Sequence, residues 1–138
     1  MRPLIRFFSG LHVRLYRLTG GRFVGRMGKA PILLLTTTGR RSGTPRTTPL
    51  LYLRDGDAYA VVASFGGSPT HPAWYLNLTA NAQVDVQTGP ERFRATARTA
   101  AAEERDRLWP RLVELYGSYA SYQRKTTREI PVVLLERR

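Results

Sequence analysis

Residues 38–46 (TGRRSGTPR) gather the residue types that bind phosphate and carboxylate groups. Arginine presents a planar fork of charged donors, and backbone N–H groups can converge on an anion where glycines let the chain turn tightly. The side-chain donors are Arg40, Arg41, Ser42, Thr44 and Arg46. The segment lacks the Gly-Lys-Ser/Thr step of a P-loop. It therefore predicts either an anion site or an ordinary solvated turn, and composition alone leaves both open.

A flat ring could bind where a predicted strand ends in paired glycines, at residues 61–67 (VVASFGG). Glycine lets a ligand approach the backbone closely. Downstream, Trp74 and Asn77 are three residues apart and would share one helix face. A tryptophan beside an amide suits a heteroaromatic ring with polar edges. The alternative is that Trp74, Leu76 and Leu78 are core residues of a connecting helix.

Three tyrosines, Tyr116, Tyr119 and Tyr122, recur at every third position. Successive members are offset by about 60° around a helix, so their hydroxyl groups could line one cleft. The alternative is that they are half-buried packing residues. The two histidines, His12 and His71, are far apart in the sequence, and we expect both to be surface or capping residues.

Composition excludes several other chemistries. The chain has 138 residues and no cysteine, which rules out disulfides, thiolate zinc sites and cysteine nucleophiles. With only two histidines we expect no metal site. The formal net charge is +12, and residues 1–46 hold ten basic side chains and no acidic one. This favours an anionic partner: nucleic acid, an anionic membrane surface or a polyanionic small molecule.

Turn signals separate short runs of apolar residues, which predicts a mainly antiparallel sheet. Strands are expected at residues 32–38, at 47–64 as a hairpin turning at Asp55-Gly56, at 82–89 and 91–98 as a hairpin around Gly89-Pro90, and at 130–137. Helices are expected at residues 3–19, at 72–81 with Pro72 in the first helical position, and at 100–125 with a bend near Pro110 and Gly117. We predict an α+β, mainly β protein, a small antiparallel barrel of about six strands with three helices.

The N-terminal third is predicted to hold a basic amphipathic helix at residues 3–19, followed by a glycine-rich loop at 19–31. Residues 1–30 would lead into a barrel domain at residues 31–138. The helix could lie on an anionic membrane surface, or its apolar side chains could cap an open end of the barrel. No apolar run approaches the roughly 20 residues needed to span a bilayer. We expect a cytoplasmic protein and leave open a peripheral contact with the inner face of the cell membrane.

Three segments, at residues 33–53, 61–87 and 109–136, closely resemble the deazaflavin-dependent nitroreductase and F420H2-dependent quinone reductase family of actinobacteria. The motifs keep their order and spacing from about residue 32 to residue 136. The resemblance implies a split β-barrel that transfers a hydride from reduced coenzyme F420 to a quinone, a nitroaromatic compound or another activated acceptor.

The resemblance also implies roles for individual residues. Arg40, Arg41, Ser42 and Arg46 would hold the phosphate and oligoglutamate tail of the coenzyme. Its deazaflavin ring would be lined by Pro49, Val62, Ala63, Ser64, Gly66, Trp74 and Asn77. Tyr116, Tyr119 and Tyr122 would border the acceptor, with Tyr119 or Tyr122 as proton donor and ordered water as an equal candidate. A protein of this kind needs only to clamp donor and acceptor face to face, which agrees with the lack of a metal site.

Two other functions fit a basic barrel. It could bind nucleic acid without catalysis, although its aromatic residues cluster in predicted helices instead of alternating along strands as a base-stacking platform requires. It could also be an FMN or haem enzyme, although it lacks a suitable histidine for haem. We expect a small-molecule acceptor and no nucleic acid partner; the natural acceptor and the oligomeric state stay open.

Overall fold

The computed structural model describes residues 26–27 and 30–138, so the predicted helix at residues 3–19 lies outside the described residues. The end of the glycine-rich segment differs from the loop we expected. There β1 (Arg26–Met27) pairs with the start of β2 (Ala30–Thr38), with Arg26 opposite Pro31 and Met27 opposite Ala30.

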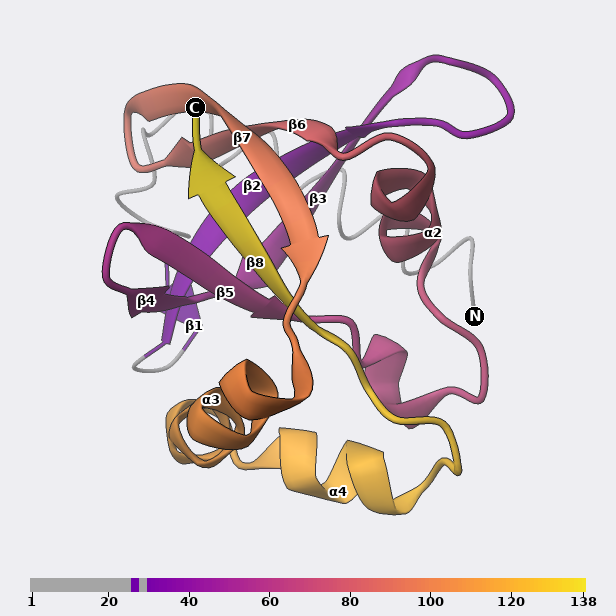
Figure 1. Cartoon of the computed structure of the whole chain (residues 1–138), viewed down its shortest axis with the longest axis vertical. Helices are drawn as coiled ribbons and strands as arrows, with labels where there is room; N and C mark the ends of the chain where they lie inside the picture. Colours follow the sequence, from indigo (N-terminus) through magenta and orange to yellow (C-terminus); the bar gives the residue numbers. More distant parts are fainter. Residues whose placement is uncertain (1–25, 28–29) are drawn as a thin grey trace.

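The sheet is antiparallel at every strand pair of the described chain. Its other strands are β3 (Pro45–Leu51), β4 (Leu53–Asp55), β5 (Ala58–Val62), β6 (Gln83–Thr88), β7 (Glu91–Thr99) and β8 (Val132–Arg137). The order is β1-β2-β6-β7-β8-β5-β4, and β3 also pairs with β2. Figure 1 shows this sheet curling on itself, which confirms the predicted barrel. The two-residue strand β1 is too short to have been distinguished from a loop, whereas β4 falls within the hairpin predicted at residues 47–64.

The predicted hairpins form at their predicted turns. Gly56, with φ +60°, lies in the two-residue link that sets Asp55 opposite Ala58. Thr88 likewise faces Glu91 across Gly89-Pro90. The strand expected from residue 47 is interrupted at Tyr52, however. The Tyr52 N–H still donates to the Pro31 carbonyl of β2 (3.1 Å), but Pro31 has no N–H to return the bond. The chain passes there from pairing with β2 to pairing with β5.

Alternate side chains of β5 and β8 pack on opposite faces of the sheet. One face belongs to a core cluster that includes Leu33, Leu35, Val61, Val133 and Leu135. The other face packs under the C-terminal helices, in a second cluster that includes Val62, Leu108, Leu112, Ile130 and Leu134. The sheet is therefore covered on both faces along these strands.

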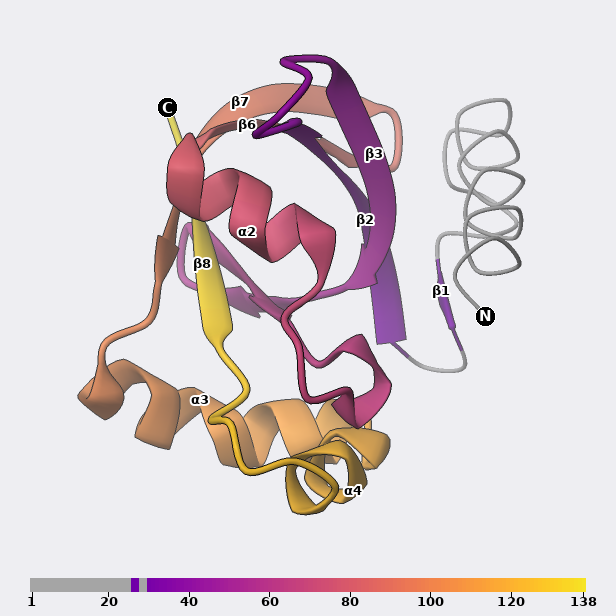
Figure 2. The same ribbon diagram turned by 90° about the vertical axis from the view of Figure 1, so that its right-hand side faces the viewer.

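Helix α2 (Ala73–Ala80) lies across the barrel, and α3 (Ala102–Leu115) and α4 (Ser118–Arg124) lie below it (Figure 2). Pro72 is the N-cap residue of α2, whereas we predicted it in the first helical position, which Ala73 occupies. Pro110 sits inside α3 without ending it, so the break in the predicted helix at 100–125 falls only at Tyr116-Gly117. None of the helices in the described part of the chain is long and apolar enough to cross a membrane.

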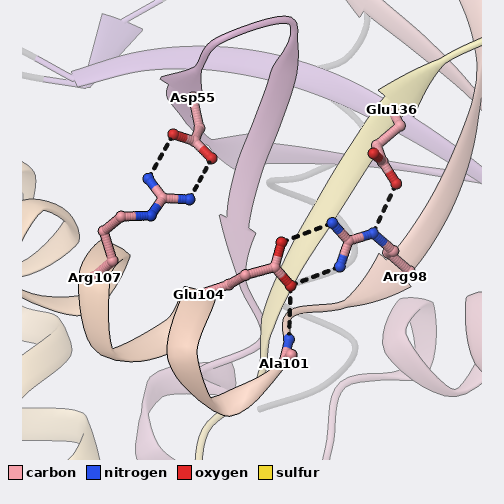
Figure 3. Close-up of polar contacts among 6 residues, drawn as sticks. All are labelled: Asp55, Arg98, Ala101, Glu104, Arg107 and Glu136. Atoms are coloured by element: carbon pink, nitrogen blue, oxygen red, sulfur yellow. Dashed lines mark hydrogen bonds and ion pairs between the residues drawn. The ribbon is translucent and has the colours of Figure 1, made fainter.

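Ion pairs connect α3 to the sheet, as Figure 3 shows. Arg98 donates to both carboxylate oxygens of Glu104 at 2.7 Å and to Glu136 at 2.7 Å. Glu104 also accepts the Ala101 N–H (2.9 Å), and these hydrogen bonds lower its pKa to about 2. Arg107 donates to both oxygens of Asp55 and lowers the pKa of that carboxyl group. The start of α3 is thereby held against β4, β7 and β8.

Candidate functional site

The segment between β2 and β3, with the first residues of β3, forms what we call the arginine loop (residues 39–46). Its turn is closed by the hydrogen bonds Gly39 N–H to Thr44 O and Gly43 N–H to Gly39 O, both 2.8 Å. The Ser42 hydroxyl lies 2.7 Å from that of Thr44 and accepts the Thr44 N–H (3.2 Å), so Ser42 shapes the turn.

The three arginines of this loop, Arg40, Arg41 and Arg46, are exposed. Within the described ranges, none of them has a carboxylate partner. Exposed guanidinium groups that no acid neutralises attract phosphate or carboxylate ligands. The loop therefore keeps its charge available to an anion.

Asn77 holds the arginine loop against α2. Its Oδ1 accepts the Arg40 N–H (3.1 Å) and the Arg40 Nη1 (3.2 Å), and its Nδ2 donates to the Thr37 hydroxyl (3.2 Å). The side chain is 4% exposed, so these protein contacts occupy its amide. Asn77 orients Arg40 here, and the prediction that it contacts a ring directly stays untested.

Trp74 packs in the barrel core with Leu78 and is 8% exposed. This agrees with the alternative that these residues belong to the core of a connecting helix. Its predicted contact with a cofactor ring stays a prediction. The structure shows that α2 seals one face of the barrel, while its Asn77 reaches the arginine loop.

The chain turns sharply after β5, in the short 3-10 helix η1 (Phe65–Gly67). Phe65, Gly66 and Gly67 have consecutive positive φ angles of 45°, 64° and 81°. Phe65 is the one non-glycine residue with positive φ in the described chain, and this conformation is strained for a bulky side chain. The turn is closed by the Gly67 N–H, which donates to Ser64 O (2.9 Å).

The predicted ring contacts on β5 and η1 differ in how accessible they are. Val62 and Ala63 are buried, Ser64 is half-buried, and Gly66 is exposed. Of these four, Ser64 and Gly66 are therefore available to a ligand at the surface.

The three tyrosines come together across a break between two helices, where the sequence predicted a bend near Gly117 within one helix. Tyr116 ends α3 and the others lie on α4. The Tyr116 and Tyr122 hydroxyl groups are 3.3 Å apart, and this hydrogen bond is the main cause that raises the pKa of Tyr122. Tyr119 is 5% exposed, packs against Trp109 and has its pKa raised by burial. Tyr116 and Tyr122 are therefore the accessible pair, and the raised pKa of Tyr122 keeps its proton in place at neutral pH.

Direct packing of η1 on α4 brings the turn and the tyrosines together. A Cβ atom on Gly67 would lie 2.9 Å from Tyr122 O and 3.0 Å from Tyr122 Cα, so only glycine fits. Figure 2 shows η1 and α4 at one end of the molecule, the arginine loop at the other, and α2 between them. Half-buried Pro49 lies in β3, opposite Leu34, on the strand that leaves the arginine loop.

His71 and Arg128 were not predicted as part of this region. His71 is half-buried instead of a surface or capping residue, and its Nδ1 lies 3.1 Å from Arg128 Nη1. Burial is the main cause that lowers the pKa of His71, and the Arg128 charge adds to it. A lone arginine in the connector before β8 carries no local pattern that could have indicated this contact.

The chain is similar to several known proteins. The model of the F420H(2)-dependent quinone reductase family matches residues 9–137. An F420H(2)-dependent quinone reductase of Mycobacterium tuberculosis is 49% identical over 132 residues, covering 93% of this chain and 89% of that protein. The solved structure of an F420-H2-dependent reductase, FDR-A, has a TM-score of 0.71 at 48% identity, covering 77% of this chain and 94% of that one. A second solved structure, described only as a domain-swapped dimer, has a TM-score of 0.74 at 42% identity, covering 92% of this chain and 95% of that one.

Proposed function

Because the chain belongs to the F420H(2)-dependent quinone reductase family, we propose that it has one elongated site for hydride transfer from reduced F420 to a quinone. The site runs from the arginine loop to the turn at residues 64–67 and the pair Tyr116 and Tyr122. The arginine loop takes the phosphate and glutamate tail of the coenzyme. Ser64 and Gly66 lie along its ring, and Tyr116 and Tyr122 border the acceptor. Nitroaromatic compounds are proposed as further acceptors of the same site.

The observation that carries this proposal is the set of unneutralised arginines in a loop that Asn77 holds in place. A tail with phosphate and carboxylate groups needs several charged donors in a fixed arrangement. The arginine loop supplies three guanidinium groups, and the Asn77 amide fixes one of them. The donor set therefore fits a polyanionic tail.

The other end of the site fits a flat ring and an acceptor. Bound F420 would supply the hydride; the chain supplies orientation and a proton. Gly66 leaves the exposed part of the turn at residues 64–67 without a side chain, and Gly67 packs directly on the helix that carries Tyr122. A hydride donor held along η1 would therefore lie close to an acceptor held by the tyrosines.

A fluorescence titration tests the proposed function directly. We expect the purified chain to change F420 fluorescence at micromolar concentrations and to bind FMN and single-stranded DNA far more weakly. Comparable affinity for FMN would favour a flavin enzyme on the same barrel. Binding to DNA alone would favour the nucleic acid alternative.

Replacing Tyr122 with phenylalanine should lower kcat for a quinone without changing the affinity for F420. A positioned general acid contributes about 10²-fold or more to a rate, and the Tyr122 hydroxyl is the proposed donor. Tyr116→Phe removes the partner of that hydroxyl and should have a smaller effect. Steady-state kinetics and the F420 titration together measure both quantities.

Tyr119→Phe is the matched control because the Tyr119 ring is buried in the core. We expect it to leave kcat nearly unchanged. A loss of rate in Tyr119→Phe alone would return the donor role to Tyr119, and unchanged rates in all three variants would assign the proton to ordered water.

Peripheral membrane contact is proposed for the basic segment that precedes β2, because a lipophilic quinone partitions into membranes. The full chain should co-sediment with vesicles of anionic lipid at low salt and dissociate as salt rises. A chain that starts at Arg26 should no longer co-sediment but should still bind F420. If the full chain does not co-sediment with anionic vesicles at low salt, the proposed membrane contact is wrong.

A further inference from the structure

Arg128 connects two loops that are far apart in the sequence. It lies in the connector between α4 and β8, and its half-buried guanidinium donates to three backbone carbonyl groups of the segment that follows β5. Nε donates to Ser68 O (2.9 Å), Nη1 to Ala63 O (3.2 Å) and Nη2 to Ser64 O (2.8 Å). Nη1 also lies 3.1 Å from His71 Nδ1, so the segment is held at both of its ends.

This arrangement is unusual for an arginine because its partners are neutral. In the described part of the chain no carboxylate pairs with Arg128, and the neighbouring Glu129 pairs with Arg105 instead. Burial lowers the pKa of Arg128, which shows that its charge is partly desolvated. A desolvated charge is costly unless hydrogen bonds satisfy it, so the carbonyl groups and Arg128 depend on each other.

The segment held by Arg128 contains the strained turn of the proposed site. Phe65 has a positive φ angle of 45° just before Gly66 and Gly67, and for a bulky residue such a conformation persists only where surrounding contacts impose it. Arg128 binds the carbonyl groups just before this turn, at Ala63 and Ser64, and just after it, at Ser68. Arg128 therefore holds the backbone on both sides of the turn, and we call these three hydrogen bonds the Arg128 clamp.

The base of this clamp is itself fixed. The Arg128 carbonyl accepts Gln123 Nε2 (2.8 Å), while Gln123 Oε1 accepts the Ile130 N–H (2.9 Å) and Arg105 Nη2 (3.0 Å). Arg105 also donates from Nε to Ile130 O (3.1 Å). These contacts fasten the connector to α3 and α4, the elements that carry the tyrosines.

We propose that Arg128 is a positioning residue for hydride transfer: by clamping residues 63–71 to the connector before β8, it sets where Ser64 and Gly66 hold the ring relative to Tyr122. The inference rests on the proposed function, since it assumes that the ring lies along this turn. Arg128 itself need not touch the coenzyme. Its effect passes through the backbone of η1.

The test compares Arg128→Met with Arg105→Met in the full chain. Both variants lose a half-buried arginine from the same hydrogen-bond network, but only Arg128 reaches the turn at residues 64–67. We expect Arg128→Met to weaken F420 binding by roughly tenfold or more and to speed amide hydrogen exchange at residues 64–68. In Arg105→Met, Gln123 still binds the Arg128 carbonyl and the Ile130 N–H, so the connector keeps its place. This variant should therefore lower Tm but leave F420 affinity and this exchange nearly unchanged.

Arg128→Lys, which keeps the charge but lacks the planar fork, should fold and show an intermediate loss, and it replaces Arg128→Met if that variant does not fold. Millimolar guanidinium should restore F420 binding in Arg128→Gly.

Unchanged F420 affinity in the folded Arg128 variants, or an equal loss in Arg105→Met, would overturn the inference. Should the unaltered chain fail to bind F420, the proposed function fails. Exchange at residues 64–68 needs no coenzyme, so it still decides whether Arg128 clamps the turn.

Discussion

The double variant Arg41→Ala/Arg46→Ala is expected to bind F420 about a hundredfold more weakly than the unaltered chain, because each lost guanidinium removes charge-assisted hydrogen bonds worth roughly 1.5 kcal/mol or more. Arg41 and Arg46 are exposed, so the lower end of the usual range applies. Arg40 is left in place because its hydrogen bonds with Asn77 also hold the loop. The measurement is the fluorescence titration at fixed ionic strength.

A matched control separates a specific tail site from general charge attraction. Arg92→Ala/Arg94→Ala removes the same two positive charges from exposed positions of β7. It should weaken binding only slightly, with the difference vanishing as salt rises. If the two double variants lose affinity equally, or if Arg41→Ala/Arg46→Ala retains full affinity, the tail of the coenzyme binds elsewhere.

The features predicted correctly from the sequence are those with local causes. The turns at Asp55-Gly56 and Gly89-Pro90 and the arginine loop are each encoded within a few consecutive residues, and all three form where expected. The interruption at Tyr52 is different. Tyr52 faces Pro31, a residue on another strand that has no N–H to return a bond, and no local pattern around residue 52 could indicate that partner.

The candidate site also combines features that local sequence predicts with features that depend on distant residues. The spacing of Trp74 and Asn77 was correctly expected to place them on one helix, but their contacts depend on residues far along the chain. Asn77 accepts hydrogen bonds from Arg40, 37 positions earlier, and donates one to Thr37, 40 positions earlier. Arg128 likewise binds Ala63, 65 positions away. Long-range contacts of this kind decide which polar groups are accessible to a ligand and which are hydrogen-bonded to other parts of the protein.

The tyrosines meet in space for a different reason from the one that their spacing indicated. We expected three rings on one helix with a bend near Gly117, whereas the helix breaks there and the rings meet across the break. Ring centroids of Tyr116 and Tyr119 are 5.0 Å apart, and those of Tyr116 and Tyr122 are 6.3 Å apart. The break turns Tyr119 into the core and leaves the other two hydroxyl groups paired.

Gly67→Ala should be the most damaging single substitution at the site, lowering the free energy of unfolding by roughly 2–5 kcal/mol. The new methyl group would meet Tyr122 backbone atoms at 2.9 and 3.0 Å, and φ is +81°. Gly66→Ala is the control, because its φ of +64° carries a similar backbone cost but no atom lies within 4 Å of the added Cβ. Denaturant unfolding measures both.

The difference between the two variants isolates the packing of η1 on α4. If that packing sets the distance from ring to acceptor, Gly67→Ala should also lower the rate of quinone reduction in the fraction that remains folded, because even a small displacement of reacting groups is costly. Equal destabilisation by Gly66→Ala and Gly67→Ala would mean that α4 moves away from the added methyl group at little cost. The turn would then not fix the position of the Tyr122 hydroxyl, and the proposed arrangement of donor and acceptor would have to be abandoned.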